Sequence, residues 1–294
     1  MNKIPTRPMR IIFTDLDGSL LDHHSYGFAP AAPLLLDLER SGIPVIPTTS
    51  KTAGEVLVLR QQLNNHHPFI VENGAAIYIP QGYFNDQLMQ TTPICQQSGF
   101  FVLRNTCSNH HWQTLLLQVA DDFKTEFETF SSIFTSAGAE GLAKLTGLEV
   151  EAAELAHRRE HSEPVLWLGS TDRKQAFTET LQQAGAEVLQ GGRFLSVGGD
   201  IDKGRAMLQL RDLYLRHYQQ TQCDLLAIGD SGNDIAMLEQ ATSALVIRSD
   251  NHGFPELNSA GSNSNKDIYY TNQTGSDGWV EGVSRWLSRT DHTH

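Results

Sequence analysis

Aspartates occur in two closely spaced pairs, each following a short apolar segment. Asp15 and Asp17 stand near the start of the chain, and Asp230 and Asp234 stand near its end. Four carboxylates brought to one place repel one another unless a cation joins them. Mg²⁺ suits such a place, because it takes oxygen ligands, usually one or two carboxylates with water and substrate phosphate. The pattern therefore indicates magnesium-dependent chemistry on a phosphate group.

The same residue types can carry phosphoryl transfer. A carboxylate held on Mg²⁺, such as that of Asp15, can attack phosphorus and form an aspartyl-phosphate. A second carboxyl group two residues on, that of Asp17, can protonate the leaving alkoxide and then activate water. The reaction also needs hydrogen-bond donors for the phosphoryl oxygens. Thr49 and Lys203 have suitable side chains, and Lys203 begins a predicted helix.

Short apolar runs and helical patterns alternate in the first and last parts of the chain, as in a doubly wound parallel sheet. The expected strands cover 10–14, 43–47, 69–71, 225–228 and 244–247, and the expected helices cover 30–41, 55–63, 203–218, 235–240 and 278–287. Open parallel sheets form their sites at the carboxyl ends of the strands. The polar residues expected there are Asp15, Asp17, Thr49, Ser50, Lys51, Glu72, Asn73, Asp230, Asn233 and Asp234.

The middle of the chain has a different pattern. Strand-like runs at 100–103, 164–168, 187–190 and 194–197 stand among helical stretches at 112–123, 140–145, 149–158 and 171–184. This mixture predicts an α+β block with an antiparallel sheet. We therefore expect an α/β core formed by 1–84 and 199–294, interrupted by an inserted α+β domain over 85–198.

The charge balance limits the classes of partner. The 294-residue chain has 22 Lys and Arg against 34 Asp and Glu, which gives a formal net charge of −12. A chain this acidic is not expected to bind nucleic acid or an anionic membrane surface. The three cysteines lack metal-ligand spacing, and we find no signal peptide or membrane-spanning apolar stretch. These features predict a cytoplasmic protein that acts on a small molecule.

Four motifs then occur in order, namely Asp15-Leu-Asp-Gly-Ser-Leu20, Thr49, Asp202-Lys203-Gly204 and Gly229-Asp-Ser-Gly-Asn-Asp234. Together they resemble the motifs of haloacid-dehalogenase-type phosphatases, in the subclass whose α/β cap is inserted between the second and third motifs. The resemblance implies a Rossmann-like core with Asp15 as the nucleophile and Asp17 as the general acid and base. It also implies that Thr49 and Lys203 hold the phosphoryl group.

The resemblance extends to the ligands. Mg²⁺ would be bound by Asp15, the backbone carbonyl of Asp17 and Asp230, and supported by Asn233 and Asp234. Three further segments, Pro47-Thr-Thr-Ser-Lys-Thr52, Glu72-Asn-Gly-Ala75 and Gly191-Gly-Arg-Phe194, are similar to those of the mannosyl-3-phosphoglycerate phosphatases. They imply a phosphorylated sugar-acid substrate contacted by Ser50, Lys51, Asn73 and Arg193. An arginine such as Arg193 can hold a carboxylate through two hydrogen bonds.

Other interpretations of the same residues stay open at this point. Thr49 and Ser50 can be helix N-caps, and Lys51 or Arg193 can be ordinary surface charges. The alternative functions are a general sugar-phosphate phosphatase, a phosphomutase, and a ligand sensor built on an inactive phosphatase. Because a sensor is expected where the nucleophile is lost, the presence of Asp15 and Asp17 argues against it.

Overall fold

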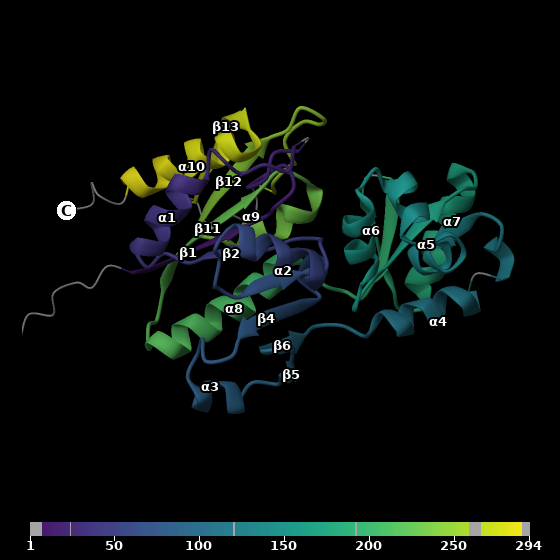
Figure 1. Ribbon diagram of the computed structural model, residues 1–294, viewed down its shortest axis with the longest axis horizontal. Helices are drawn as coiled ribbons and strands as arrows, with labels where there is room; N and C mark the ends of the chain where they lie inside the picture. Colours follow the sequence, from purple (N-terminus) through teal and green to yellow (C-terminus); the bar gives the residue numbers. More distant parts are fainter. Residues whose placement is uncertain (1–7, 24, 120, 192, 259–265, 290–294) are drawn as a thin grey trace, which may run out of the picture. The chain divides into compact units, whose positions relative to one another are not determined.

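The computed structural model describes residues 8–23, 25–119, 121–191, 193–258 and 266–289 (Figure 1). The chain forms two compact units. Unit 1 contains the described residues of Met1–Thr49, Leu63–Leu103 and Asp202–His294, and unit 2 contains those of Ser50–Gln62 and Arg104–Ile201. Each unit has its own sheets and helices.

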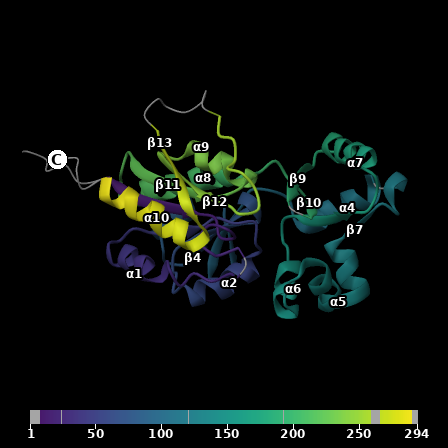
Figure 2. The same cartoon turned by 90° about the horizontal axis from the view of Figure 1, so that it is seen from above.

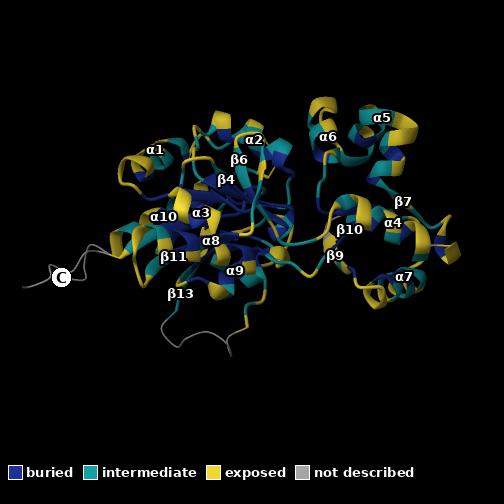
Figure 3. Cartoon of the chain, turned by 90° about the horizontal axis from the view of Figure 1, so that it is seen from below, coloured by how far each residue is buried: buried dark blue, intermediate teal, exposed yellow. Residues whose placement is uncertain are grey.

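Unit 1 is built on a five-stranded parallel sheet with the order β13-β12-β11-β1-β2. Its strands are β1 (Met9–Thr14), β2 (Val45–Pro47), β11 (Cys223–Gly229), β12 (Ser243–Arg248) and β13 (Asp267–Thr274). The central strands are buried because helices cover both faces, so they consist of continuous apolar runs (Figure 3). The predicted parallel α/β sheet is confirmed, although β13 was not predicted.

A second sheet of unit 1, with the order β3-β4-β6-β5, continues from the parallel one. It contains β3 (Phe69–Val71), β4 (Ala76–Pro80), β5 (Cys95–Gln97) and β6 (Phe100–Arg104). Strand β3 meets the end of β2 through a parallel bridge between Thr48 and Ile70, whereas β3 with β4 and β5 with β6 are antiparallel. Helix α3 (Asp86–Gln90) packs its Leu88 and Met89 into the same core. The segment 85–103 therefore lies in unit 1, whereas the sequence placed it in the inserted domain.

In the described part of unit 1, four helices cover the parallel sheet. Helices α8 (Lys203–Tyr218) and α9 (Ile235–Gln240) share a core cluster with the β1 residues Ile11 and Phe13. Thr14, which follows Phe13 in β1, accepts a hydrogen bond of 3.1 Å from the Trp279 indole of α10 (Gly275–Arg289). Helix α10 lies along β12 and β13 (Figure 2), and α1 (Ala32–Arg40) begins beside it. This alternation along β1 fits a strand with a different helix pair on each face.

Unit 2 has a four-stranded antiparallel sheet with the order β7-β8-β10-β9, as the sequence predicts for the middle of the chain. Its strands are β7 (Phe127–Thr129), β8 (Glu163–Trp167), β9 (Glu187–Gly191) and β10 (Phe194–Gly198). Its helices are α2 (Ala53–Gln62), α4 (Asn109–Val119), α5 (Phe130–Thr146), α6 (Val150–His157) and α7 (Thr171–Gln183). Trp112, Phe177 and Val197 form part of its buried core. Among the described residues, no helix is long and apolar enough to cross a membrane.

The core of unit 1 generates a stability prediction. Leu210 of α8 is fully buried, whereas Leu36 of α1 is 50% exposed. Leu210→Ala is expected to lower the free energy of unfolding by about 2–5 kcal/mol, because it removes buried methyl groups and leaves a cavity. Leu36→Ala is the matched control and should change it by no more than about 0.5 kcal/mol. Denaturant unfolding measures both, and equal losses would contradict the assigned packing.

Candidate active site

The site begins where two neighbouring parallel strands end. Strands β1 and β11 pair so that Thr14 lies opposite Ile228, and the Asp15 N–H donates to the Ile228 carbonyl oxygen at 2.8 Å. Asp15 is the first residue after β1, and Asp230 is the first residue after β11. The ladder therefore brings their backbones side by side at the carboxyl edge of the sheet, where open α/β sheets bind ligands.

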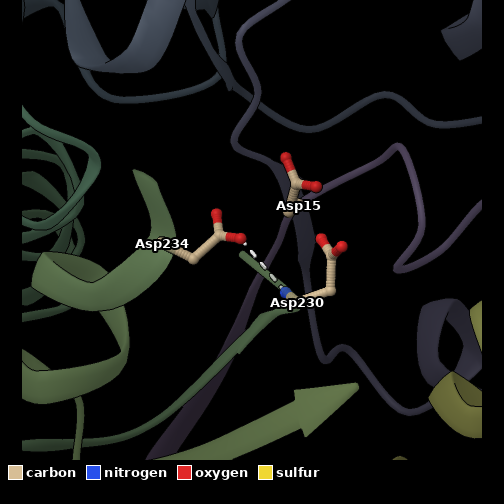
Figure 4. A group of neighbouring side chains, drawn as sticks. All are labelled: Asp15, Asp230 and Asp234. Atoms are coloured by element: carbon tan, nitrogen blue, oxygen red, sulfur yellow. Dashed lines mark hydrogen bonds between the residues drawn. The ribbon is translucent and has the colours of Figure 1, made fainter. Parts of the chain in front are cut away.

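Three buried carboxylates meet at this edge. Asp15, Asp230 and Asp234 each offer an oxygen atom, and these atoms all lie within 4.8 Å of one another. Their carboxyl groups converge on one space from the loops after β1 and β11 (Figure 4). Asp17 is partly exposed, and its charge helps to raise the pKa of Asp15.

Lys203 is the cation of this cluster. It is fully buried, and its Nζ lies 2.6 Å from Asp15 Oδ1 and 2.7 Å from Asp234 Oδ1. It is also the first residue of α8, where the helix dipole disfavours a positive charge. The two carboxylates offset that cost. Burial lowers the pKa of Lys203, but the charges of Asp15 and Asp234 and their hydrogen bonds outweigh it and raise the pKa.

The pKa values of Asp15 and Asp230 are both raised above the ordinary value of an aspartate. Burial raises the pKa of Asp15, and Lys203 opposes this rise only in part, while the neighbouring carboxylates add to it. Burial, with the charge of Asp234, raises the pKa of Asp230 to about 6. A bound cation would favour the ionised forms of both groups.

Asp234 holds its neighbours in place with both oxygens. Its Oδ1 accepts from Lys203, and its Oδ2 accepts from the backbone N–H groups of Asp230 and Ser231, each at 3.1 Å. Asp230, in contrast, has a buried Oδ1 without a hydrogen-bond partner in the described part of the chain. An orphaned buried carboxylate oxygen next to Asp15 is a feature that a divalent cation would satisfy, so these residues fit Mg²⁺.

A turn after β3 contacts the loops that carry Thr49, Asp202 and Asn233. Glu72, Asn73 and Gly74 form the short 3₁₀ helix η1 (Glu72–Gly74), and all three have left-handed backbones, with φ of 48°, 60° and 102°. The Asn73 N–H donates to the Thr49 carbonyl at 2.9 Å, and its Oδ1 accepts from Asn233 Nδ2 at 3.0 Å. A Cβ at position 74 would lie 2.4 Å from the Asp202 carbonyl oxygen, so glycine is required there.

The predicted residues of unit 1 therefore form one connected group. Lys203 donates hydrogen bonds to Asp15 and Asp234, and the Asp230 N–H donates to Asp234. The Asn73 side chain accepts a hydrogen bond from Asn233. Thr49 is buried after β2, and its N–H donates to the Ile70 carbonyl at 3.0 Å. The Asn73 side chain, predicted to contact substrate, has its oxygen engaged by Asn233.

The other predicted substrate residues belong to unit 2. The carbonyl of Ser50 accepts from Arg159 Nη1 at 3.2 Å, and Lys51 Nζ lies 3.8 Å from Glu55 Oε1. Arg193 is exposed, and its guanidinium donates to the Leu145 carbonyl oxygen near the end of α5. Gly192 of the same motif lies outside the described residues.

Two features were missed from the sequence. A cavity of about 420 Å³ in unit 2 is rich in basic groups, with the lining Arg104, Ser108, Asn109, His110, Arg159, Glu160 and His161. In an acidic chain such a cluster points to an anionic ligand. In unit 1, His252 Nε2 lies 3.5 Å from Asp230 Oδ2. Arg159 and His161 stand close together in the sequence and are the signal for the first feature, whereas nothing near residue 252 indicates the second.

Known proteins are similar to this chain in sequence and in fold. The family model for haloacid dehalogenase-like hydrolases matches residues 12–267. A glucosyl-3-phosphoglycerate/mannosyl-3-phosphoglycerate phosphatase of Persephonella marina is 32% identical over 284 residues, which cover 96% of this chain and 98% of that protein. Its namesake in Methanococcoides burtonii is 35% identical over 238 residues, or 81% and 84% of the two chains. A solved structure from Thermoplasma acidophilum, 16% identical, has the same fold with a TM-score of 0.63 over 96% of this chain and 99% of that chain.

The buried Lys203 generates a prediction about stability and pH. Lys203→Met should lower the free energy of unfolding by about 3–5 kcal/mol at pH 8 without metal, because Asp15 and Asp234 lose their shared cation. The pKa of Asp15 lies above its ordinary value, so its protonation favours the folded state, and the loss should shrink as the pH falls toward 5. Denaturant unfolding in EDTA at several pH values measures this.

Arg205→Met is the matched control on the same helix. Arg205 is 48% exposed and pairs with Asp202 at 2.6 Å, so its loss should cost no more than about 1 kcal/mol. Equal costs for the two variants, or a cost of Lys203→Met that does not vary with pH, would contradict the buried charge cluster.

Proposed function

Because the chain belongs to the haloacid dehalogenase-like hydrolase family, we propose that it is a phosphatase of phosphorylated sugar-acids. Its substrate is glucosyl-3-phosphoglycerate or mannosyl-3-phosphoglycerate, the compounds in the names of both relatives. The observation that carries the phosphatase activity is the contact of Lys203 with Asp15 and Asp234 beside Asp230, all buried at the carboxyl edge of the sheet. This arrangement places a carboxylate nucleophile beside a buried lysine, and a bound cation would add the positive charge that the phosphate needs.

In the proposed reaction, an Asp15 oxygen attacks phosphorus and the ester P–O bond breaks. Asp17 gives its proton to the departing sugar-acid oxygen, which leaves an aspartyl-phosphate on Asp15. Asp17, now ionised, takes a proton from water, and the water oxygen attacks phosphorus to release inorganic phosphate and restore Asp15. Thr49 and Lys203 donate to the phosphoryl oxygens, which carry charge throughout.

Mg²⁺ is the cation that we propose for this site. Asp15, Asp230 and the backbone carbonyl of Asp17 would hold it. Asp234 and Asn233 would support them, since Asp234 fixes the Asp230 backbone and Asn233 is bonded to Asn73. When bound, the ion supplies positive charge that offsets the repulsion between the carboxylates and the substrate phosphate.

Recognition of the rest of the substrate is proposed for residues of unit 2 and for Asn73. Ser50, Lys51 and Arg193 are the proposed contacts, to which the basic cavity adds Arg159 and His161. An arginine suits the carboxylate of a phosphoglycerate, which a neutral sugar phosphate lacks. We propose unit 2 as the specificity domain on this ground.

The first test concerns the two acids that act on phosphorus. Asp15→Asn should abolish phosphate release, because an amide does not attack phosphorus. Asp17→Asn should slow mannosyl-3-phosphoglycerate hydrolysis by roughly 10²–10⁴-fold, and an aryl phosphate by less, since its leaving group needs no proton. Steady-state kinetics on both substrates measures this. Equal losses for the two substrates would contradict the general-acid role of Asp17.

The second test concerns the cation. Asp230→Ala should raise the Mg²⁺ concentration needed for half-maximal activity at least tenfold, whereas Asp212→Ala, at an exposed position, should leave it unchanged. Below the pKa of about 6 for Asp230, protons compete with the ion, so Mg²⁺ affinity should fall by about tenfold per pH unit. Calorimetric titration with Mg²⁺ at pH 5 and pH 8 checks this. Full activity in EDTA would overturn the metal dependence.

The third test concerns the substrate. We would compare kcat/KM for mannosyl-3-phosphoglycerate, a neutral sugar phosphate and an aryl phosphate in the wild type, Arg193→Ala and Arg159→Ala. Loss of a charge-assisted contact costs about 1.5–3 kcal/mol, which should appear only with the sugar-acid. A uniform loss would assign the arginine to the fold instead. Equal wild-type rates on all three substrates would favour a general sugar-phosphate phosphatase.

A further inference from the structure

Unit 1 has a second cavity, of about 330 Å³, at the other edge of its parallel sheet. Met9, the first residue of β1, and Pro44, next to the start of β2, both line it. Asp15 follows the opposite end of β1, so this cavity is separate from the carboxylate cluster. The full lining is Met9, Glu39, Gly42, Pro44, His67, Tyr83, Tyr214, Tyr218 and Gln220.

A chain of hydrogen bonds organises the polar groups of this lining. His67 Nε2 lies 2.8 Å from Glu39 Oε2, and His67 Nδ1 lies 2.7 Å from the Tyr83 hydroxyl. The Tyr83 hydroxyl lies 2.7 Å from that of Tyr214, which is buried. These four side chains come from α1, the loop before β3, the loop after β4, and α8. The chain therefore fixes the walls of the cavity.

One arrangement of donors and acceptors satisfies every group of this chain. A neutral His67 donates from Nε2–H to Glu39 and accepts at Nδ1 from Tyr83, whose oxygen accepts from Tyr214. A doubly protonated His67 would reverse the chain and leave the buried Tyr214 hydroxyl to donate elsewhere. Glu39 contributes a carboxylate to the lining, and no lysine or arginine is among the described residues of the lining.

Aromatic rings form much of the remaining wall. Tyr218 is 53% exposed, and its ring lies 6.4 Å from that of Tyr214 at an angle of 14°. Tyr83 meets Tyr214 edge-on at 5.9 Å, and His67 meets Tyr83 edge-on at 5.8 Å. Ring faces next to a carboxylate attract cations, above all those whose charge is covered by alkyl groups.

We propose that this cavity binds a small alkylated organic cation of the quaternary ammonium class. The hydroxyls of Tyr83 and Tyr214 and the His67 nitrogens are engaged in the chain, so they offer little to a strongly hydrated ion. An anion would meet the charge of Glu39. A methylated ammonium group needs no hydrogen-bond donor or acceptor, gains from the aromatic rings, and neutralises the carboxylate. The cavity is large enough for a small-molecule ligand.

Tetramethylammonium chloride is the probe for the test. Titration of the full-length protein, followed by saturation-transfer NMR on the methyl protons, should show saturable binding. Sodium chloride at equal ionic strength should not compete, and tert-butanol, a neutral molecule of similar size, should bind at least threefold more weakly. Repeating the titration with Mg²⁺ present should give the same affinity, since the two sites are separate.

Three variants locate the binding. Tyr218→Leu keeps an apolar side chain but removes the ring, and Glu39→Gln removes the charge; each should weaken tetramethylammonium binding by about three- to tenfold. Tyr270→Leu is the matched control, because Tyr270 is 43% exposed and lies outside this cavity. Phosphatase activity should stay at the wild-type level in all three. No saturable binding in the wild type, or equal affinity in all variants, would overturn the proposal.

Discussion

The rest of the site depends on the pairing of one buried lysine with two buried aspartates. Lys203 stands at the start of a helix and without contact to solvent, two conditions that each disfavour its charge. Asp15 and Asp234 are equally unfavourable by themselves, so none of the three groups is stable there without the others. The fold must therefore bring β1, α8 and the loop after β11 together at one point. The proposed catalysis depends on the same arrangement.

The turn at Glu72–Gly74 holds the neighbouring loops in place through hydrogen bonds and close packing. Asn73 is bonded to the backbone of Thr49 and to the side chain of Asn233, while Gly74 lies against the backbone of Asp202. The left-handed backbones of Glu72 and Asn73 are costly because both residues have a Cβ, and such strain persists only where the surroundings determine it. One turn thus fixes the loops that carry Thr49, Lys203 and the second acidic motif.

Local patterns explain which parts were predictable. Strands such as β1 are continuous apolar runs, and the acidic motifs follow them directly, so both could be identified from the sequence. Strand β13 was missed because it is an edge strand in which Thr271 is the buried position among polar neighbours. The bond between Asn73 and Asn233 joins residues 160 positions apart. Contacts of this kind, like the tyrosine–histidine chain at the other edge of the sheet, arise from tertiary packing and leave no local signal.

Unit 2 is formed by two separate segments of the chain, which matters for any exchange of this domain between related proteins. Its two segments are joined through Thr52, whose hydroxyl donates to the Leu155 carbonyl at 2.9 Å, and through Gly54, which packs against the Leu155 side chain. A chimaera that replaced residues 104–201 alone would set a foreign α6 against the native α2. The transferable module is discontinuous, and recombination that respects it must carry residues 50–62 as well.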